Sequence, residues 1–87
     1  MAIVFIPAMM QPLTGGVSQM RIAGRTVRTI INTLEERFPG IKERLLQDGD
    51  IRPDVAVAID GELALDGLAE LVQEDSEVHF IPPISGG

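Results

Sequence analysis

One apolar stripe near the middle of the chain limits the folds that the chain can adopt. Large apolar side chains recur at helical spacing at Val27, Ile30, Ile31, Leu34 and Phe38. This spacing places them on one face of an α-helix. Thr26 is the expected N-cap of that helix, and Pro39-Gly40 is its expected end. A helix with a single apolar face needs a sheet to cover that face.

Short β-prone segments lie on both sides of the predicted helix. Residues 2–6 are apolar at every position, which predicts a strand that is central in a sheet and covered on both faces. Residues 17–22 alternate as the half-exposed partner of a hairpin. Further strands are predicted at residues 55–59, 62–65 and 78–81. The sequence therefore predicts an α+β fold in which a mixed four- to five-stranded sheet packs on one main helix.

The remaining segments are predicted to form turns, loops and short helices. Residues 7–16 have the proline and glycine content of a loop, which ends in a turn at Gly15-Gly16. Asp60-Gly61 predicts a tight turn between two strands. Residues 41–46 predict a short second helix, and residues 68–72 predict a single helical turn.

Composition excludes several kinds of site. The 87 residues include no cysteine, so the chain has no disulfide, thiolate metal site or cysteine nucleophile. His79 is the only histidine, and the three serines (Ser18, Ser76 and Ser85) have no obvious base in their sequence context. We therefore expect a protein that is not an enzyme and binds no metal or cofactor.

Charge is distributed unevenly along the chain. The net charge is −6, with residues 1–47 at +3 and residues 48–77 at −9. A solvated acidic surface and a docking face both fit the second segment. The bases of the first segment are few and lack interleaved aromatic residues, which argues against a nucleic-acid partner. No run approaches the ~20 apolar residues of a membrane span, and no basic region precedes an apolar stretch at the start of the sequence. We therefore expect a cytoplasmic protein.

The last ten residues combine a strand, a pair of prolines and two glycines. Pro82 and Pro83 end the predicted strand because neither can donate an N–H to a sheet ladder. Gly86 and Gly87 have no Cβ atom, so a partner's backbone or a reactive group can approach them closely. We expect one domain at residues 1–82 and a flexible tail at residues 83–87. An incidental Gly-Gly, such as a cloning remnant, is the alternative interpretation.

The chain resembles the ubiquitin-like β-grasp sulfur carriers, the family of the small subunit of molybdopterin synthase and the thiamin sulfur carrier. The landmarks of this resemblance follow one another as Gly24-Arg25-Thr26-Val27, Phe38-Pro39-Gly40-Ile41, Asp60-Gly61-Glu62 and Ile81-Pro82-Pro83-Ile84-Ser85-Gly86-Gly87. Ile6-Pro7, followed by the sequence PLTGG at residues 12–16, is similar to the carriers that deliver sulfur for cysteine biosynthesis. The resemblance spans nearly the whole chain and implies a β-grasp fold.

The resemblance also implies the chemistry of the tail. In such carriers a partner enzyme uses ATP to adenylate the C-terminal carboxylate, here that of Gly87. A persulfide sulfur from a sulfur donor protein then displaces the adenylate and leaves a thiocarboxylate. This group delivers sulfur to an acceptor such as cysteine synthase or the large subunit of molybdopterin synthase. Splitting one difficult step into two easier ones is the usual logic of covalent carriers.

The body of such a carrier is used for recognition. In ubiquitin-like folds the last strand lies beside the first, and the outward face of the sheet docks on partners. The parity of the last strand assigns Val78 and Phe80 to the core, and His79 and Ile81 to the outward face. The implied partner-binding residues are Gly86, Ser85, Ile84, Ile81, His79 and Phe5. An ordinary exposed side chain is the alternative for His79.

Two other functions remain open at this stage. A ubiquitin-like modifier, conjugated to proteins through Gly87, would use the same tail and the same activation. A non-covalent β-grasp interaction module would not depend on Gly86 and Gly87 at all. The sequence leaves the acceptor pathway open among cysteine, molybdopterin, thiamin and other products.

Overall fold

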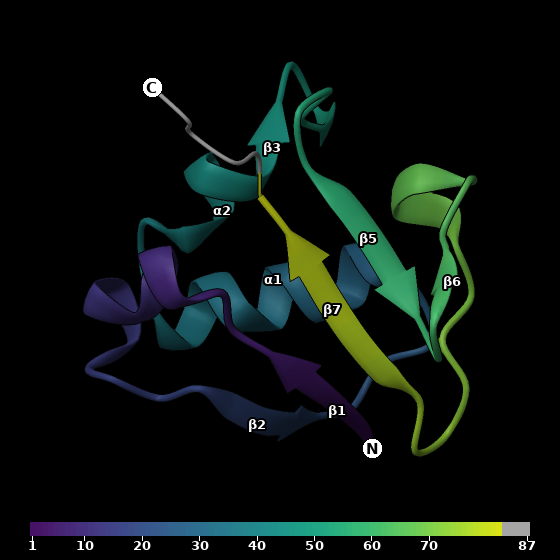
Figure 1. The fold of residues 1–87 in the computed structure, drawn as a ribbon, viewed down its shortest axis with the longest axis horizontal. Coiled ribbons are helices and arrows are strands. Elements are labelled where there is room, and N and C mark those ends of the chain that lie inside the picture. The colour runs from purple at the N-terminus through teal and green to yellow at the C-terminus, as the bar shows by residue number, and fades with distance from the viewer. Residues whose placement is uncertain (83–87) are drawn as a thin grey trace.

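A five-stranded sheet in the order β2-β1-β7-β5-β6 organises the protein, as the computed structural model of residues 1–82 shows (Figure 1). Its strands are β1 (Ala2–Phe5), β2 (Gln19–Ile22), β5 (Ala56–Ile59), β6 (Glu62–Leu63) and β7 (Glu77–Ile81). β1 and β7 are parallel, and the other neighbours are antiparallel. The predicted α+β fold with a mixed sheet is confirmed. The flexible tail predicted at residues 83–87 lies outside the described residues.

The main helix, α1 (Val27–Arg37), covers one face of the sheet (Figure 1). The hydroxyl oxygen of Thr26 accepts a hydrogen bond from the backbone N–H of Thr29 at 3.2 Å, which makes Thr26 the N-cap as predicted. The buried side chains of the helix are Val27, Ile30, Ile31 and Leu34. These side chains are the predicted stripe without Phe38, which is half-buried beyond the end of the helix. Among the described residues, no helix is long and apolar enough to cross a membrane.

A second, short helix, α2 (Ile41–Leu45), follows α1 directly and buries Ile41 and Leu45. The carboxylate of Glu35 accepts hydrogen bonds from the N–H groups of Gly40, at 3.1 Å, and Lys42, at 2.9 Å. These two backbone hydrogen bonds lower the pKa of Glu35 below its ordinary value. Glu35 thus joins the two helices by satisfying N–H groups that the start of α2 leaves free.

Residues 8–14, predicted as part of a loop, form a 3₁₀-helix, η1 (Ala8–Thr14). Met10 and Thr14 are buried there. The hydroxyl group of Thr14 lies 2.8 Å from the carbonyl oxygen of Val17, so it is satisfied within the core. The loop prediction failed because the burial of Met10 is a tertiary effect that proline and glycine content does not reveal. The turn at Gly15-Gly16 is present, and both residues have positive φ angles.

Two further predictions about strands need correction. Residues 46–51 contain a small hairpin of β3 (Leu46–Gln47) and β4 (Asp50–Ile51), where no strand was predicted. β1 is central, as predicted, but it is not covered on both faces. Ala2 and Val4 are buried on the helix side, and Ile3 and Phe5 are only half-buried on the other side. The main helix covers one face of the sheet and leaves the other open to solvent.

The turn between β5 and β6 is tied by hydrogen bonds to the segment that leads into β7. Asp60 and Gly61 form the predicted tight turn, both with positive φ angles. The carboxylate of Asp60 accepts hydrogen bonds from the N–H of Glu77, at 2.9 Å, and from the hydroxyl group of Ser76, at 2.8 Å. These contacts, the backbone one first, hold the pKa of Asp60 below its ordinary value.

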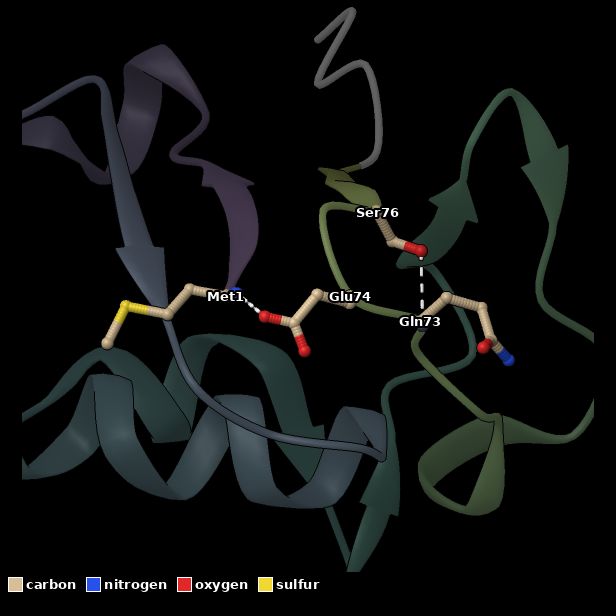
Figure 2. Close-up of polar contacts among 4 residues, drawn as sticks. All are labelled: Met1, Gln73, Glu74 and Ser76. Carbon is tan, nitrogen blue, oxygen red and sulfur yellow. Dashed lines mark hydrogen bonds and ion pairs between the residues drawn. The ribbon is translucent and has the colours of Figure 1, made fainter.

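The segment that leads into β7, residues 73–76, also contacts the start of β1. The N-terminal ammonium group of Met1 lies 2.9 Å from a carboxylate oxygen of Glu74 (Figure 2). The hydroxyl oxygen of Ser76 accepts a hydrogen bond from the N–H of Gln73 at 3.1 Å (Figure 2). Both members of the Met1–Glu74 pair are exposed, so this pair adds little stability by itself. It lies where β1 and β7 begin side by side.

We predict that Ile31→Ala and Leu34→Ala each lower the free energy of unfolding by about 2–5 kcal/mol, because each deletes buried aliphatic bulk. Urea denaturation measures the change. Arg28→Ala, on the exposed side of the same helix, is the matched control and should have little effect. Losses below ~1 kcal/mol at both core positions would contradict the packing of α1 on the sheet.

We predict that Asp60→Asn destabilises the protein at neutral pH, because an amide nitrogen cannot accept the hydrogen bond of Ser76. A folded-state pKa below the unfolded one stabilises the protein above the unfolded pKa, and this stabilisation disappears as the pH falls through the folded pKa. The difference between wild type and variant should therefore shrink as the pH falls from about 5 to about 2. Urea denaturation at a series of pH values measures it.

Asp48→Asn is the control for Asp60→Asn, since Asp48 also has a positive φ angle and is exposed. Its stability difference from wild type should not follow the same pH curve. If the difference in unfolding free energy between wild type and Asp60→Asn is the same at every pH, then the contacts to Ser76 and Glu77 do not depend on the charge of the carboxylate.

Candidate functional site

The face of the sheet opposite α1, called the outer face below, is the candidate site. Its side chains, which alternate with the buried ones, are Ile3, Phe5, Gln19, Arg21, Ala56, Ala58, Leu63, Glu77, His79 and Ile81. The strand register aligns five of them in one row across the sheet, in the order Gln19, Phe5, His79, Ala58 and Leu63. Four of these five side chains are apolar or aromatic; Gln19 and Leu63 are exposed, and Phe5, His79 and Ala58 are half-buried.

Phe5 and His79 form the centre of the row. Their rings are stacked with centroids 4.1 Å apart and an angle of 7° between the ring planes. The stack exists because β1 and β7 are parallel neighbours with Phe5 and His79 in register. His79 Nε2 also lies 3.6 Å from Glu77 Oε1 at the edge of the stack. His79 is therefore not an isolated exposed side chain, because it forms a flat surface with Phe5.

Ile81 extends the outer face toward the C-terminal end of β7. Its side chain is 47% exposed, and its neighbour across the strand pair is Ala56. Val78 and Phe80 are buried, so the predicted parity of the last strand is confirmed. The structure thus brings Phe5, His79 and Ile81 to one face.

The other predicted site residues are Ile84, Ser85, Gly86 and Gly87, which lie outside the described residues. Covalent connectivity places them after Pro82, which directly follows β7. The outer face therefore leads toward the segment that carries the predicted chemistry.

Two parts of the outer face were not predicted as site residues. Ala56 and Ala58 have short side chains, so the surface of β5 is recessed beside His79 and Ile81. Leu63 follows in the same row and is 63% exposed. A signal was present in the sequence, since residues 55–59 alternate between large side chains and alanines. That pattern shows that the alanines share a face, but it does not show which strands lie beside them.

A cleft of about 240 Å³ lies beside Pro82. Met9 and Met10 of η1 line one part of it, and Arg44 and Arg52 supply two of its charged groups. Nε of Arg52 is 3.4 Å from a carboxylate oxygen of Asp54, which offsets part of its charge. Sequence reasoning missed this cleft because η1 and α2 meet only in the folded chain.

The fold and the outer face define a class of protein. One main helix packs on a mixed sheet, and the last strand lies parallel to the first at the centre of that sheet. This arrangement is the ubiquitin-like β-grasp fold. Comparison with known families gives the particular group: the model of the ThiS family matches residues 4–87. The chain belongs to the ThiS family of ubiquitin-like sulfur carriers.

Individual relatives agree with this assignment. The chain is 30% identical over 89 aligned residues to the sulfur carrier protein CysO of Mycobacterium tuberculosis, a match that covers 97% of this chain and 96% of the relative. It is 34% identical over 64 residues to small archaeal modifier protein 3 of Haloferax volcanii, with 71% and 70% covered. A chain in the crystal structure of the Amycolatopsis orientalis BexX/CysO complex superimposes with a TM-score of 0.94 at 29% identity, and both chains are fully covered.

Proposed function

We propose that this sulfur carrier works through the α-carboxylate of Gly87, which a partner enzyme adenylates and a sulfur donor converts to a thiocarboxylate. The observation that supports this proposal most directly is the family match, which runs from residue 4 to residue 87 and includes both tail glycines. The full-length relationship to a protein named as a sulfur carrier supports it further.

The proposed reaction has two stages. A carboxylate is a poor electrophile, so it first attacks the α-phosphorus of ATP on the partner enzyme and releases pyrophosphate. A persulfide of the donor protein then attacks the carbonyl carbon of the acyl-adenylate and releases AMP. A second thiol of the donor breaks the resulting acyl disulfide, which leaves a thiocarboxylate on Gly87 and a disulfide on the donor. The thiocarboxylate sulfur is the nucleophile that the acceptor receives.

The carrier's own contribution is recognition and reach. The acid, base and metal ion needed for adenylation belong to the partner in this proposal, and so does the ATP site. The outer face, with Phe5, His79 and Ile81, docks on the partner. Docking fixes the position of β7, and the tail then carries Gly87 into the partner's active site.

For the acceptor, we propose an enzyme of the cysteine synthase type. The loop residues Ile6-Pro7 and the sequence PLTGG at residues 12–16 support this choice, because they resemble the carriers that deliver sulfur for cysteine biosynthesis. The large subunit of molybdopterin synthase is the other acceptor to test. Thiocarboxylated carrier should transfer sulfur to the first enzyme and not to the second. Sulfur transfer to molybdopterin synthase alone would reverse the choice.

A ubiquitin-like modifier is the second candidate function, and the archaeal modifier relative is the observation that favours it. Intact-mass measurement of the protein purified from its own cells separates the two functions. A carrier gains the mass of one sulfur in exchange for one oxygen. A modifier appears as isopeptide adducts on other proteins. Isopeptide adducts without any thiocarboxylate form would favour the modifier.

We predict that deleting Gly87, or adding one residue after it, abolishes adenylation and leaves the fold unchanged. The carboxylate must approach the α-phosphate to roughly 3–3.5 Å. One extended residue changes the reach of the tail by about 3.3–3.6 Å. This change is as large as the attack distance itself, so the carboxylate would no longer reach the α-phosphate correctly. ATP–pyrophosphate exchange with the cognate adenylating enzyme measures the effect.

Gly87→Ala is the matched control for length, because it keeps the reach and adds only a Cβ atom. We expect it to be impaired less than the deletion, since the added methyl group crowds a channel shaped for bare backbone. Full exchange activity in the Gly87 deletion would exclude both the carrier and the modifier functions.

We predict that Ile81→Asp weakens binding to the adenylating enzyme, because it places a charge where an apolar contact is expected. Calorimetric titration without ATP measures the affinity separately from catalysis. Leu71→Asp is the matched control, since Leu71 is also an exposed apolar side chain (64%) but does not belong to the outer face. Equal weakening by both variants would contradict docking through the outer face.

A further inference from the structure

We propose that the free edge of β2 binds an extended peptide segment of a second protein, which adds to the sheet as a further strand. In the segment that fits, apolar side chains alternate with carboxylates. The site uses neither Gly87 nor the docking residues Phe5, His79 and Ile81, so it goes beyond the proposed function. It gives the carrier a separate point of attachment at the opposite edge of the sheet from β6.

β2 forms one edge of the sheet, and no strand of residues 1–82 lies beyond it (Figure 1). The N–H of Ile6 donates a hydrogen bond to the carbonyl oxygen of Ser18 at 2.8 Å, so the backbone of Ser18 faces β1. Backbone groups alternate in direction along an antiparallel strand. The N–H and C=O groups of Gln19 and Arg21 therefore point away from β1. An extended peptide can pair with such groups.

The side chains of β2 set the alternation that the added strand needs. Met20 is half-buried and Ile22 is buried on the side of the sheet that faces α1, whereas Gln19 and Arg21 are exposed on the outer face. Opposite side chains of paired strands have Cβ atoms about 4.5–5.5 Å apart. An apolar residue of the peptide would therefore contact Met20. A carboxylate in the next position would lie beside Arg21.

A cleft of about 580 Å³ continues this edge past the end of β2. Residues 23–25 line it, together with residues 1–2 and 71–74. Leu71 is 64% exposed there. The N–H of Val72 donates a hydrogen bond to the carbonyl oxygen of Arg25 at 2.8 Å, which ties the two parts of the lining together. The cleft therefore offers a fixed apolar contact for one end of the peptide.

Two arginines at this edge are available for carboxylates. Arg21 and Arg25 are exposed, and within residues 1–82 neither forms an ion pair. Glu74 is the acidic residue of the cleft, and its carboxylate already lies 2.9 Å from the ammonium group of Met1 (Figure 2). The edge therefore attracts negative charge. A nucleic acid has no peptide backbone to pair with β2, so an acidic peptide fits both features of the site.

The site lies at the end of the sheet away from the tail. Ala2 pairs with Ile22, and β1 runs parallel to β7, so the cleft adjoins the N-terminal end of β7. Pro82 follows the other end of β7. A peptide on β2 therefore leaves the start of the tail uncovered. The partner that fits is a protein that holds the carrier, distinct from the enzyme that adenylates Gly87.

The first test uses a capped synthetic peptide in which valine and glutamate alternate. Titration into the ¹⁵N-labelled protein should shift the amide signals of residues 19–25 most, and amide exchange at Gln19 and Arg21 should slow. In an added strand, alternate peptide N–H groups face β2 and the others face solvent. Two matched peptides therefore carry N-methyl groups at the valines or at the glutamates, and only one of them should lose binding. Equal binding of the two would overturn strand addition.

The second test separates this site from the proposed docking surface. Arg25→Glu and Leu71→Asp should each raise the calorimetric Kd for the peptide about tenfold or more. Arg44→Glu makes the same change of net charge on α2, beside Pro82, and should have a smaller effect. Ile81→Asp should bind the peptide like the wild type. Equal effects of the two arginine variants would show that net charge alone acts, and this would overturn the site.

The remaining outcomes are also decisive. A wild type that does not bind the valine–glutamate peptide overturns the inference. So does displacement of the peptide by a single-stranded oligonucleotide, or self-association of the wild type that Arg25→Glu abolishes in sedimentation experiments. Circular dichroism checks folding, and Arg25→Gln replaces the glutamate variant if folding is lost.

Pyrophosphate exchange in the presence of the peptide tests whether the two partners are separate. We expect KM for the carrier to stay unchanged, and a rise in KM would show that the peptide and the adenylating enzyme share a site, which would overturn the separate partner. If the wild type shows no exchange at all, the proposed function fails while the peptide titrations still test the edge of β2.

Discussion

The parallel pairing of β1 with β7 is the interaction on which the rest of the structure depends. Antiparallel neighbours can be joined by a tight turn, but parallel neighbours need a crossover connection. Here nearly the whole chain forms that crossover, and α1 lies within it. The pairing places the first and last strands of the described chain side by side within the sheet, with a further strand on each side of the pair. It also sets Phe5 beside His79, which creates the stacked centre of the outer face.

One-sided coverage of the sheet explains why a face is accessible for the proposed docking. α1 buries the inner side chains of β1, β5 and β7, and the opposite side chains remain accessible. The described chain has one main helix, which covers the inner face and leaves the outer face accessible. Because the side chains of the β5 alanines are short, the outer face is recessed between His79 and Leu63. In the proposed function, the inner face supplies stability and the outer face supplies recognition.

The chemistry proposed for this carrier demands little of its own side chains. A terminal carboxylate activated by a partner needs reach, access and a docked body, and all three follow from a small rigid domain with a tail of small residues. The cleft beside Pro82 is balanced in charge, because Arg44 and Arg52 line it together with Glu43 and Asp54.

The sequence by itself determined the elements whose signal is local. The stripe from Val27 to Leu34, the Thr26 cap and the parity of β7 all follow from periodicity and side-chain type over a few residues. Only the tertiary structure decided which face of β1 is covered, because that depends on the position of a distant helix. It also decided that Met10 is buried in η1 and that Leu63 aligns with the Phe5–His79 stack. These features arise from pairings between residues far apart in the chain, and no local pattern records such pairings.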